Sequence, residues 1–113
     1  MNNSKVLSVL GLCKKSGNLA LGFDACVESA TVGKSYLILI TQDLSANTRQ
    51  KLYNRLARTA TDLIVLTDLS TDDIGECLGK SCGVISINNE GFTKKIRSLL
   101  NFDNIYVQEE ANI

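Results

Sequence analysis

Three carboxylates close together in the sequence are the first candidates for chemistry. Asp72, Asp73 and Glu76 could work as acid and base, or hold Mg²⁺. However, Ser70 shortly precedes them, and a hydroxyl followed by acids is typical of a helix start, where the helix dipole favours negative charge. The chain contains no histidine, and nothing supplies a nucleophile with its base. We therefore expect a structural role for these carboxylates and no enzymatic activity.

Two further patterns lack parts that their chemistry requires. Gly33-Lys34-Ser35 ends like a phosphate-binding loop, but Glu28 stands where that loop has its first glycine, and a strand is expected to follow instead of a helix. The cysteines have neither metal-ligand spacing nor a CxxC motif. We expect them to be free thiols in the core, with no metal and no cofactor, at Cys13, Cys26, Cys77 and Cys82.

Glycines and polar residues gather in three predicted loops. Gly22 precedes a helix, Gln42-Asp43 follows a strand, and Gly79-Lys80-Ser81-Cys82-Gly83 separates a helix from a strand. Helix N-termini present free N–H groups to phosphate oxygens, and glycine lets a backbone approach a ligand closely. If the three loops share one edge of a sheet, they make a surface that can bind a bent phosphate backbone.

The element that must position these loops is a buried strand over residues 36–40. Tyr36 to Ile40 form an apolar run bounded by turn residues, which is typical of a strand covered on both faces. Ser45 then offers its hydroxyl to the first N–H groups of a helix. In open α/β sheets, ligands bind at such strand ends.

Helices and strands alternate along the rest of the chain, which predicts a sheet with helices on both sides. The helix over 46–59 is amphipathic, and its outer surface is basic. Its cations are Arg49, Lys51, Arg55 and Arg58. The other predicted helices cover residues 3–17, 22–33, 71–79 and 90–100, and the other predicted strands 18–21, 62–67 and 84–87.

Length and composition limit the class of protein. The 113 residues suit one domain, which we place at 1–101, with a tail at 102–113 that either docks as an extra strand or stays loose. Because the net charge is zero, binding of nucleic acid requires a local basic patch. No apolar run approaches the roughly 20 residues that a membrane helix needs. Free thiols and the lack of a leader sequence predict a cytoplasmic protein.

The order of short motifs resembles the kink-turn-binding ribosomal proteins of the seven-Ae and thirty-e type, in particular their small bacterial YlxQ-like branch. The likeness spans Val6 to about Leu100. It implies a three-layer α-β-α sandwich around a four-stranded mixed sheet, RNA binding at one end and no cofactor. Its motifs are Leu10-Gly11-Leu12, Ser16-Gly17, Gly22, Gly33-Lys34, Leu39-Ile40-Thr41-Gln42-Asp43, Asn47-Thr48, Ile74-Gly75-Glu76-Cys77-Leu78-Gly79 and Gly91-Phe92-Thr93-Lys94-Lys95.

The resemblance also indicates which residues meet RNA. Family members read the kink turn with a Gly-x-Asn-Glu-x-x-Lys segment, and the same spacing here gives Gly22-Phe23-Asp24-Ala25-Cys26-Val27-Glu28. Only the glycine matches. Glu28 puts an anion where the family has a cation, and Val32 replaces a residue that is often basic. The loop after Gly79, which is apolar in strong binders, is more polar here and includes Lys80.

We therefore expect a non-catalytic RNA-binding protein whose partner is a kink turn or ribosomal RNA and not a membrane or small-molecule substrate. The resemblance to ribosomal proteins also suggests an association with the ribosome. The alternative is a protein-interaction module on the same fold that has lost RNA binding, which Glu28 and the zero net charge favour. Lys14 is expected to assist the RNA-binding residues. These are Lys15, Gly22, Phe23, Asp24, Glu28, Lys34, Gln42, Asp43, Gly79, Lys80 and Ser81.

Overall fold

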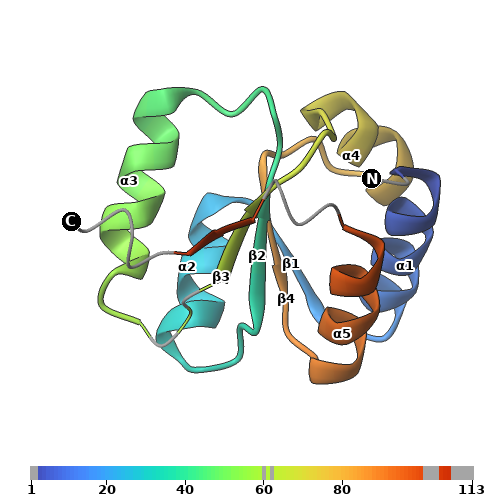
Figure 1. Ribbon diagram of the computed structural model, residues 1–113, viewed down its shortest axis with the longest axis horizontal. Helices are drawn as coiled ribbons and strands as arrows, with labels where there is room; N and C mark the ends of the chain where they lie inside the picture. Colours follow the sequence, from blue (N-terminus) through green and yellow to red (C-terminus); the bar gives the residue numbers. More distant parts are fainter. Residues whose placement is uncertain (1–2, 60, 62, 101–104, 108–113) are drawn as a thin grey trace.

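The computed structural model describes residues 3–59, 61, 63–100 and 105–107, in which five helices alternate with the strands of one sheet (Figure 1). The helices are α1 (Asn3–Lys15), α2 (Phe23–Thr31), α3 (Ala46–Leu56), α4 (Thr71–Leu78) and α5 (Glu90–Leu99). The strands are β1 (Leu19–Leu21), β2 (Leu37–Ile40), β3 (Leu63–Leu66), β4 (Val84–Ile87) and β5 (Ile105–Val107).

The sheet is mixed, and its strand order is β1-β4-β2-β3-β5. Strands β2 and β3 are parallel, whereas β4 runs antiparallel to both β1 and β2. The carboxyl ends of β1, β2 and β3 therefore meet the amino end of β4 at one edge of the sheet. The register shows this directly, because Ile40 lies opposite both Leu66 and Val84, at the end of β3 and the start of β4.

The expectation of four strands is wrong by one. Within the described part of the chain the sheet has five strands, because β5 from the tail pairs antiparallel with β3. Of the two alternatives for the tail, residues 105–107 thus take the extra strand, and residues 101–104 and 108–113 lie outside the described residues. Periodicity within so short a segment cannot show whether the edge of another strand is open to receive it.

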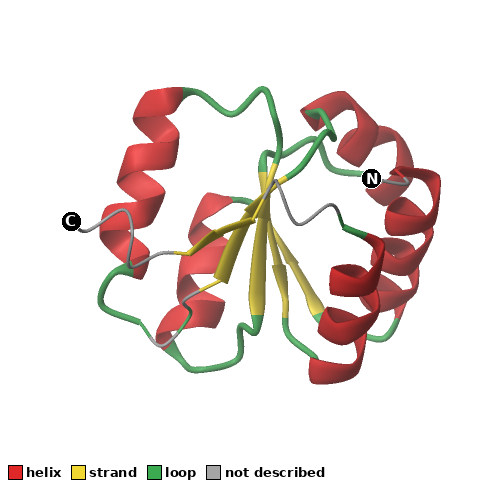
Figure 2. Ribbon diagram, in the orientation of Figure 1, coloured by secondary structure: helices red, strands yellow, loops and turns green. Residues whose placement is uncertain are grey.

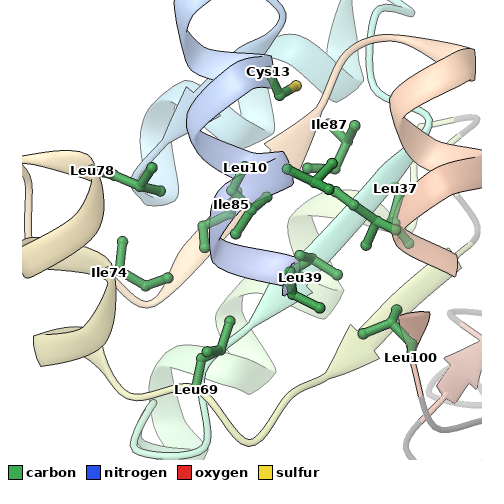
Figure 3. Close-up of a cluster of buried hydrophobic side chains, with 13 residues drawn as sticks. Leu10, Cys13, Leu37, Leu39, Leu69, Ile74, Leu78, Ile85, Ile87 and Leu100 are labelled. Atoms are coloured by element: carbon green, nitrogen blue, oxygen red, sulfur yellow. The ribbon is translucent and has the colours of Figure 1, made fainter. Parts of the chain in front are cut away.

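Helices cover both faces of the sheet, as the three-layer arrangement requires (Figure 2). Helices α2 and α3 pack on one face, and α1, α4 and α5 pack on the other. The alternation of β2 explains the two cores, since successive side chains of a strand point to opposite faces. Leu37 and Leu39 join the core under α1, α4 and α5 (Figure 3), while Ile38 and Ile40 join the core under α2 and α3.

The predicted buried strand is one residue too long at its start. Leu37 to Ile40 are fully buried, but Tyr36 precedes β2 and keeps 50% of its surface exposed. Its backbone N–H still donates to the carbonyl oxygen of Ile87, at 2.9 Å. An apolar run in the sequence does not show at which residue the covering helices end and the chain becomes exposed to solvent.

Side-chain caps fix the helix starts that the sequence indicates. The Ser45 hydroxyl accepts from the N–H of Thr48 at 3.1 Å, and α3 ends at Leu56, three residues before the predicted end. Ser70 accepts from the N–H of Asp73 at 3.1 Å, and the Asp73 carboxylate accepts from the N–H of Ser70 at 2.9 Å. This reciprocal pair is a capping box, so Asp73 has the structural role expected of it.

Candidate nucleic-acid interface

The three predicted loops meet at the end of the sheet where strands β1, β2 and β3 finish and β4 begins. We call this surface the glycine rim, and it consists of Gly22, Gln42, Asp43 and residues 79–83. The Gly22 N–H donates to the carbonyl of Val84 at 2.9 Å, next to the loop that precedes β4. The N–H of Thr41 donates to the carbonyl of Gly83 at 3.0 Å. The condition set by the sequence, that the three loops share one edge, is met.

Gly22 brings the start of α2 against Lys80. Its φ and ψ of 102° and 160° lie in a region that is essentially restricted to glycine. The Lys80 ammonium group donates to the carbonyl of Leu21 at 3.3 Å, and a Cβ on Gly22 would lie 3.3 Å from the Lys80 Nζ. The rim therefore needs glycine here both for its backbone angles and for the approach of the lysine.

The N-terminus of α2 has no side-chain cap, because Gly22 stands at the N-cap position. The first N–H groups of a helix lack partners within the helix and carry the positive end of its dipole. Lys80 adds a full positive charge beside them. Free backbone donors and an ammonium group together can bind an anionic oxygen, such as that of a phosphate.

Lys14 brings a second cation to the rim from α1. Its ammonium group donates to the carbonyl of Leu78 in the last turn of α4, and its Nζ lies 3.7 Å from the position of a Cβ on Gly79. The negative end of the α4 dipole favours a cation at this place. Among the described residues, no carboxylate lies within salt-bridge distance of Lys14 or Lys80, so both charges are available to a ligand.

The loop that carries Lys80 folds back on α4. Gly79 is the left-handed C-cap of α4, with φ of 82°. The Ser81 side chain lies over Gly75, and a Cβ on Gly75 would collide with the Ser81 hydroxyl. A Cβ on Gly83 would in turn lie 2.7 Å from the Leu44 Cδ1 atom. The sequence points to Gly79 and Gly83, but the need for Gly75 depends on a contact that only the folded chain makes.

Gln42 and Asp43 lie at the rim, but their side chains bond within the protein. The Gln42 amide donates to the carbonyl of Asp68 at 2.8 Å, and the Asp43 carboxylate accepts from the Thr71 hydroxyl at 2.8 Å and from the Thr71 N–H at 3.1 Å. The neighbouring hydroxyls of Thr41 and Thr71 lower the pKa of Asp43. These two residues connect the loop after β2 to the start of α4, and this holds the rim in shape.

The other candidates from the start of α2 are divided between its core and its surface. Phe23 is half-buried and packs against the core under α2 and α3, so most of its ring is committed to the fold. Asp24 and Glu28 are exposed and lie one turn apart. The two carboxylates are thus the negatively charged part of the surface beside the rim.

Glu28 lines a groove between α2 and the edge strand β1. The groove has a volume of about 700 Å³. Ala25, Val32 and Lys34 also line it, and 59% of the Val32 surface is exposed. Lys34 follows α2 and precedes β2, so it lies toward the edge of the sheet opposite the rim. The structure therefore does not bring Lys34 to Lys80, although both are candidates for the same site.

Lys15 also lies apart from the rim. It lines a shallow hollow between α1 and α4, together with Leu12 and Cys77. Lys14 and Lys15 are adjacent in the sequence, but neighbouring residues of a helix point about 100° apart. Only Lys14 reaches the end of α4.

The cysteines are free thiols, as expected, although they are not all in the core. Burial raises the pKa of Cys13 to about 11 and that of Cys26 to about 12. Cys82 is half-buried, and Cys77 is exposed on α4, contrary to the expectation of a core position. Among the described residues, no group of three histidine, cysteine, aspartate or glutamate side chains could hold a metal. No helix in the described ranges has the length and apolarity to cross a membrane.

The fold and the rim define a class of protein: an α/β sandwich that offers backbone amides and lysine ammonium groups to a ligand at one edge of its sheet. The chain belongs to the ribosomal protein L7Ae/L30e/S12e/Gadd45 family, whose family model matches residues 4–97. This confirms the family that the sequence motifs resemble.

Individual relatives agree with this assignment. The chain is 25% identical over 99 residues to the RNA-binding protein YlxQ of Enterococcus faecium. The aligned residues cover 88% of this chain and 94% of that protein. A protein of unknown function from Bacillus halodurans shares the fold with a TM-score of 0.72 and 25% identity, over 84% of this chain and 95% of the other. The 15.5kD RNA binding protein of Giardia lamblia matches 88% of this chain and 92% of its own chain, with a TM-score of 0.62 and 16% identity. At this identity the match supports the fold alone.

Proposed function

We propose that this protein binds structured RNA through the glycine rim, with a kink turn or a ribosomal RNA element as the ligand. The observation that carries the proposal is the position of the Lys80 ammonium group beside the uncapped N-terminus of α2. A bent RNA backbone brings phosphates close together, and such a site can neutralise them. The name of the YlxQ relative, an RNA-binding protein, supports the same conclusion.

The proposed function is binding without catalysis, in the cytoplasm and in association with the ribosome. The family name includes the ribosomal proteins L7Ae, L30e and S12e, and the YlxQ relative is named an RNA-binding protein, which supports this proposal. Backbone amides at a helix start and lysine side chains fix the position of a phosphate backbone but do not read bases. We therefore expect affinity to depend more on the shape of the RNA than on its base pairs.

The substituted side chains of α2 decide how specific this binding is. Asp24, Ala25 and Glu28 stand where kink-turn binders of the family carry asparagine, glutamate and lysine, so the contacts to sheared G·A pairs are reduced. Glu28 is exposed and turns an attraction for phosphate into a repulsion. The protein should consequently bind a kink turn more weakly than relatives that keep the whole segment.

A titration of fluorescently labelled kink-turn RNA, followed by anisotropy over a range of salt, tests the proposal. Lys80→Ala should weaken binding and reduce the slope of log K against log salt by about one. Lys95→Ala is the matched control, because Lys95 is an exposed lysine on α5, which contributes no residue to the rim. If the wild-type protein does not bind, or if the two variants behave alike, the rim is not an RNA site.

The alternative function is protein binding at the groove along α2, and one observation favours it. Glu28 and the exposed Val32 line this groove at two positions where RNA-binding members of the family often carry basic residues. The double variant Ala25→Glu, Glu28→Lys separates the two functions, because it restores the family pattern at both positions. A gain in RNA affinity supports the RNA function, whereas an unchanged affinity favours a protein partner.

A further inference from the structure

A second positively charged surface lies on α3, away from the rim lysines. Lys51 and Arg55 are exposed and one helical turn apart, which places them on one side of the helix. Arg58 continues this row, since the intervening C-cap residue, Ala57, keeps helical backbone angles. We call Lys51, Arg55 and Arg58 the basic row.

No acidic residue stands in the stretch of sequence that carries the basic row. Residues 44–61 contain four cations, Arg49 included, and no aspartate or glutamate. Because the whole chain has a net charge of zero, the remaining residues carry a net charge of −4. The salt bridge found among the described residues, Lys94 to Glu90 at 3.5 Å, lies on α5. Positive charge is thus concentrated in the stretch of sequence that forms α3 and its C-cap.

This concentration opposes the stability of the helix. Like charges four residues apart, as at Lys51 and Arg55, repel each other on a helix surface. Arg55 gains from its place in the last turn, but Lys51 lies in the middle of α3 and gains nothing from the dipole. A polyanion on this surface would relieve the repulsion.

The neighbours of the basic row also suit a phosphate backbone. The Gln50 side chain donates to the Asn54 side chain at 3.1 Å, and both are exposed beside the row. Arginine, lysine, asparagine and glutamine are side chains that contact phosphate and sugar. The large apolar residues of α3, Leu52 and Leu56, are fully buried in the core. The half-buried Tyr53 packs against the same core, so the exposed side of α3 is mostly polar and charged, whereas protein interfaces depend on apolar and aromatic anchors.

The place of α3 connects this surface to the rim. Helix α3 starts after Ser45, two residues beyond Asp43 of the rim, and runs along the outside of the molecule (Figure 1). It lies on the opposite face of the sheet from α1, which supplies Lys14 (Figure 2). The basic row begins in the middle of α3 and continues past its C-terminal end, so an RNA helix that reaches it must run from the rim along α3.

We propose that the basic row binds the phosphate backbone of an RNA helix that flanks the element held at the glycine rim. The proposal rests on RNA binding at the rim and adds a second, sequence-independent contact. If each of the three cations of the basic row contacts one phosphate of a duplex, log K falls with log salt more steeply by about 2.7. Between 50 and 200 mM salt, this contribution alone amounts to a loss of affinity of about 40-fold.

The test compares a minimal kink-turn RNA with the same RNA extended by one turn of duplex on either side. The row variant is Lys51→Ala, Arg55→Ala, Arg58→Ala. The matched control removes three exposed cations of α5, with Lys94→Ala, Lys95→Ala and Arg97→Ala. The wild-type protein should bind the extended RNA more tightly than the minimal one. The row variant should lose this gain and most of the slope of 2.7, while the control should keep both.

Each other outcome overturns the proposal in a recognisable way. If the wild-type protein binds neither RNA, RNA binding at the rim fails and this inference fails with it. If it binds and the row variant matches it on the extended RNA, only the basic row is excluded. Equal losses of RNA affinity in the row variant and the control indicate a general effect of net charge. If the row variant also loses affinity for the minimal RNA, the basic row belongs to the primary site. Thermal unfolding of both variants, and a glutamine version of the row variant, verify that the fold is intact.

Discussion

Replacement of Gly22 by alanine tests the central claim about the rim, that one glycine holds the start of α2 against Lys80. Backbone angles of 102° and 160° are costly for any residue with a Cβ. The strain should reduce the free energy of unfolding by about 1–3 kcal/mol. With an unfolding entropy of about 2.1 cal/mol/K per residue, each kcal/mol lowers the Tm of a 113-residue chain by about 4 °C.

The new Cβ has a second effect, on the ligand site. It would lie 3.3 Å from the Lys80 Nζ, which is the flexible end of a side chain and can move away. This movement costs little stability, but it takes the ammonium group from the Leu21 carbonyl and from the N-terminus of α2. Gly22→Ala should therefore lower the Tm by roughly 4–12 °C and also weaken RNA binding at temperatures where the variant is folded.

Two other glycines separate these effects by calorimetry and RNA titration. Gly17 has a φ of 79° but nothing within 4 Å of a new Cβ, so Gly17→Ala should lose about 1 kcal/mol of stability and keep RNA affinity. Gly11 lies within α1 in open space, so Gly11→Ala should gain about 0.5–1 kcal/mol. The strain argument is refuted if Gly22→Ala unfolds at the wild-type temperature. The role of the rim is refuted if Gly22→Ala is destabilised but binds RNA as the wild type does.

Three further predictions concern the fold around the rim. Asp43→Asn should lower stability at neutral pH, measured by urea unfolding, because a lowered pKa of Asp43 stabilises the native state at pH values above its unfolded pKa near 3.8. The difference from the wild type should decrease as the pH falls below 3.8 and be lost as the pH passes the lowered pKa of the folded protein. A thiol reagent at pH 8 should modify exposed Cys77 quickly and leave Cys26 unreacted, because burial raises the pKa of Cys26 to about 12. Leu39→Ala should cost about 2–5 kcal/mol in the same urea assay, because Leu39 is fully buried at the centre of the sheet.

Each of these predictions has an outcome that contradicts it. A stability difference between Asp43→Asn and the wild type that does not shrink as the pH falls from 3.8 through the lowered pKa of folded Asp43 would show that the charge of Asp43 is not its source. Rapid modification of Cys26 in the folded protein would mean that the core under α2 opens readily. For Leu39, the control is the exposed Leu12 on α1, whose replacement by alanine should change stability by less than about 0.5 kcal/mol.

Local patterns predicted much of this fold, because they determine the features concerned. The apolar run before Thr41 predicts β2, and the hydroxyls of Ser45 and Ser70 predict the starts of α3 and α4, since a cap is a contact between residues three apart. The extra strand β5 depends on the open edge of β3, far away in the sequence. No local pattern contains that information.

The candidate site was only partly predictable, for the same reason. Glycine-marked loops indicate the rim, because glycine is required where the backbone adopts unusual angles. The sequence does not show that Lys14 reaches the end of α4 while Lys15 points elsewhere and Lys34 lies toward the opposite edge. Nor does it show that the Asp43 side chain is occupied by Thr71. Which charges act together is decided by tertiary contacts.

The close fit at Gly83 has a consequence for how a ligand is received. A single methyl group there would collide with Leu44 and would lie 3.1 Å from the Thr41 hydroxyl, so the loops before β4 and after β2 are closely packed against each other at this point. The rim is consequently tightly packed where these two loops meet. If RNA binds there as proposed, we expect the protein to select a form that is already bent from among the shapes that the RNA samples.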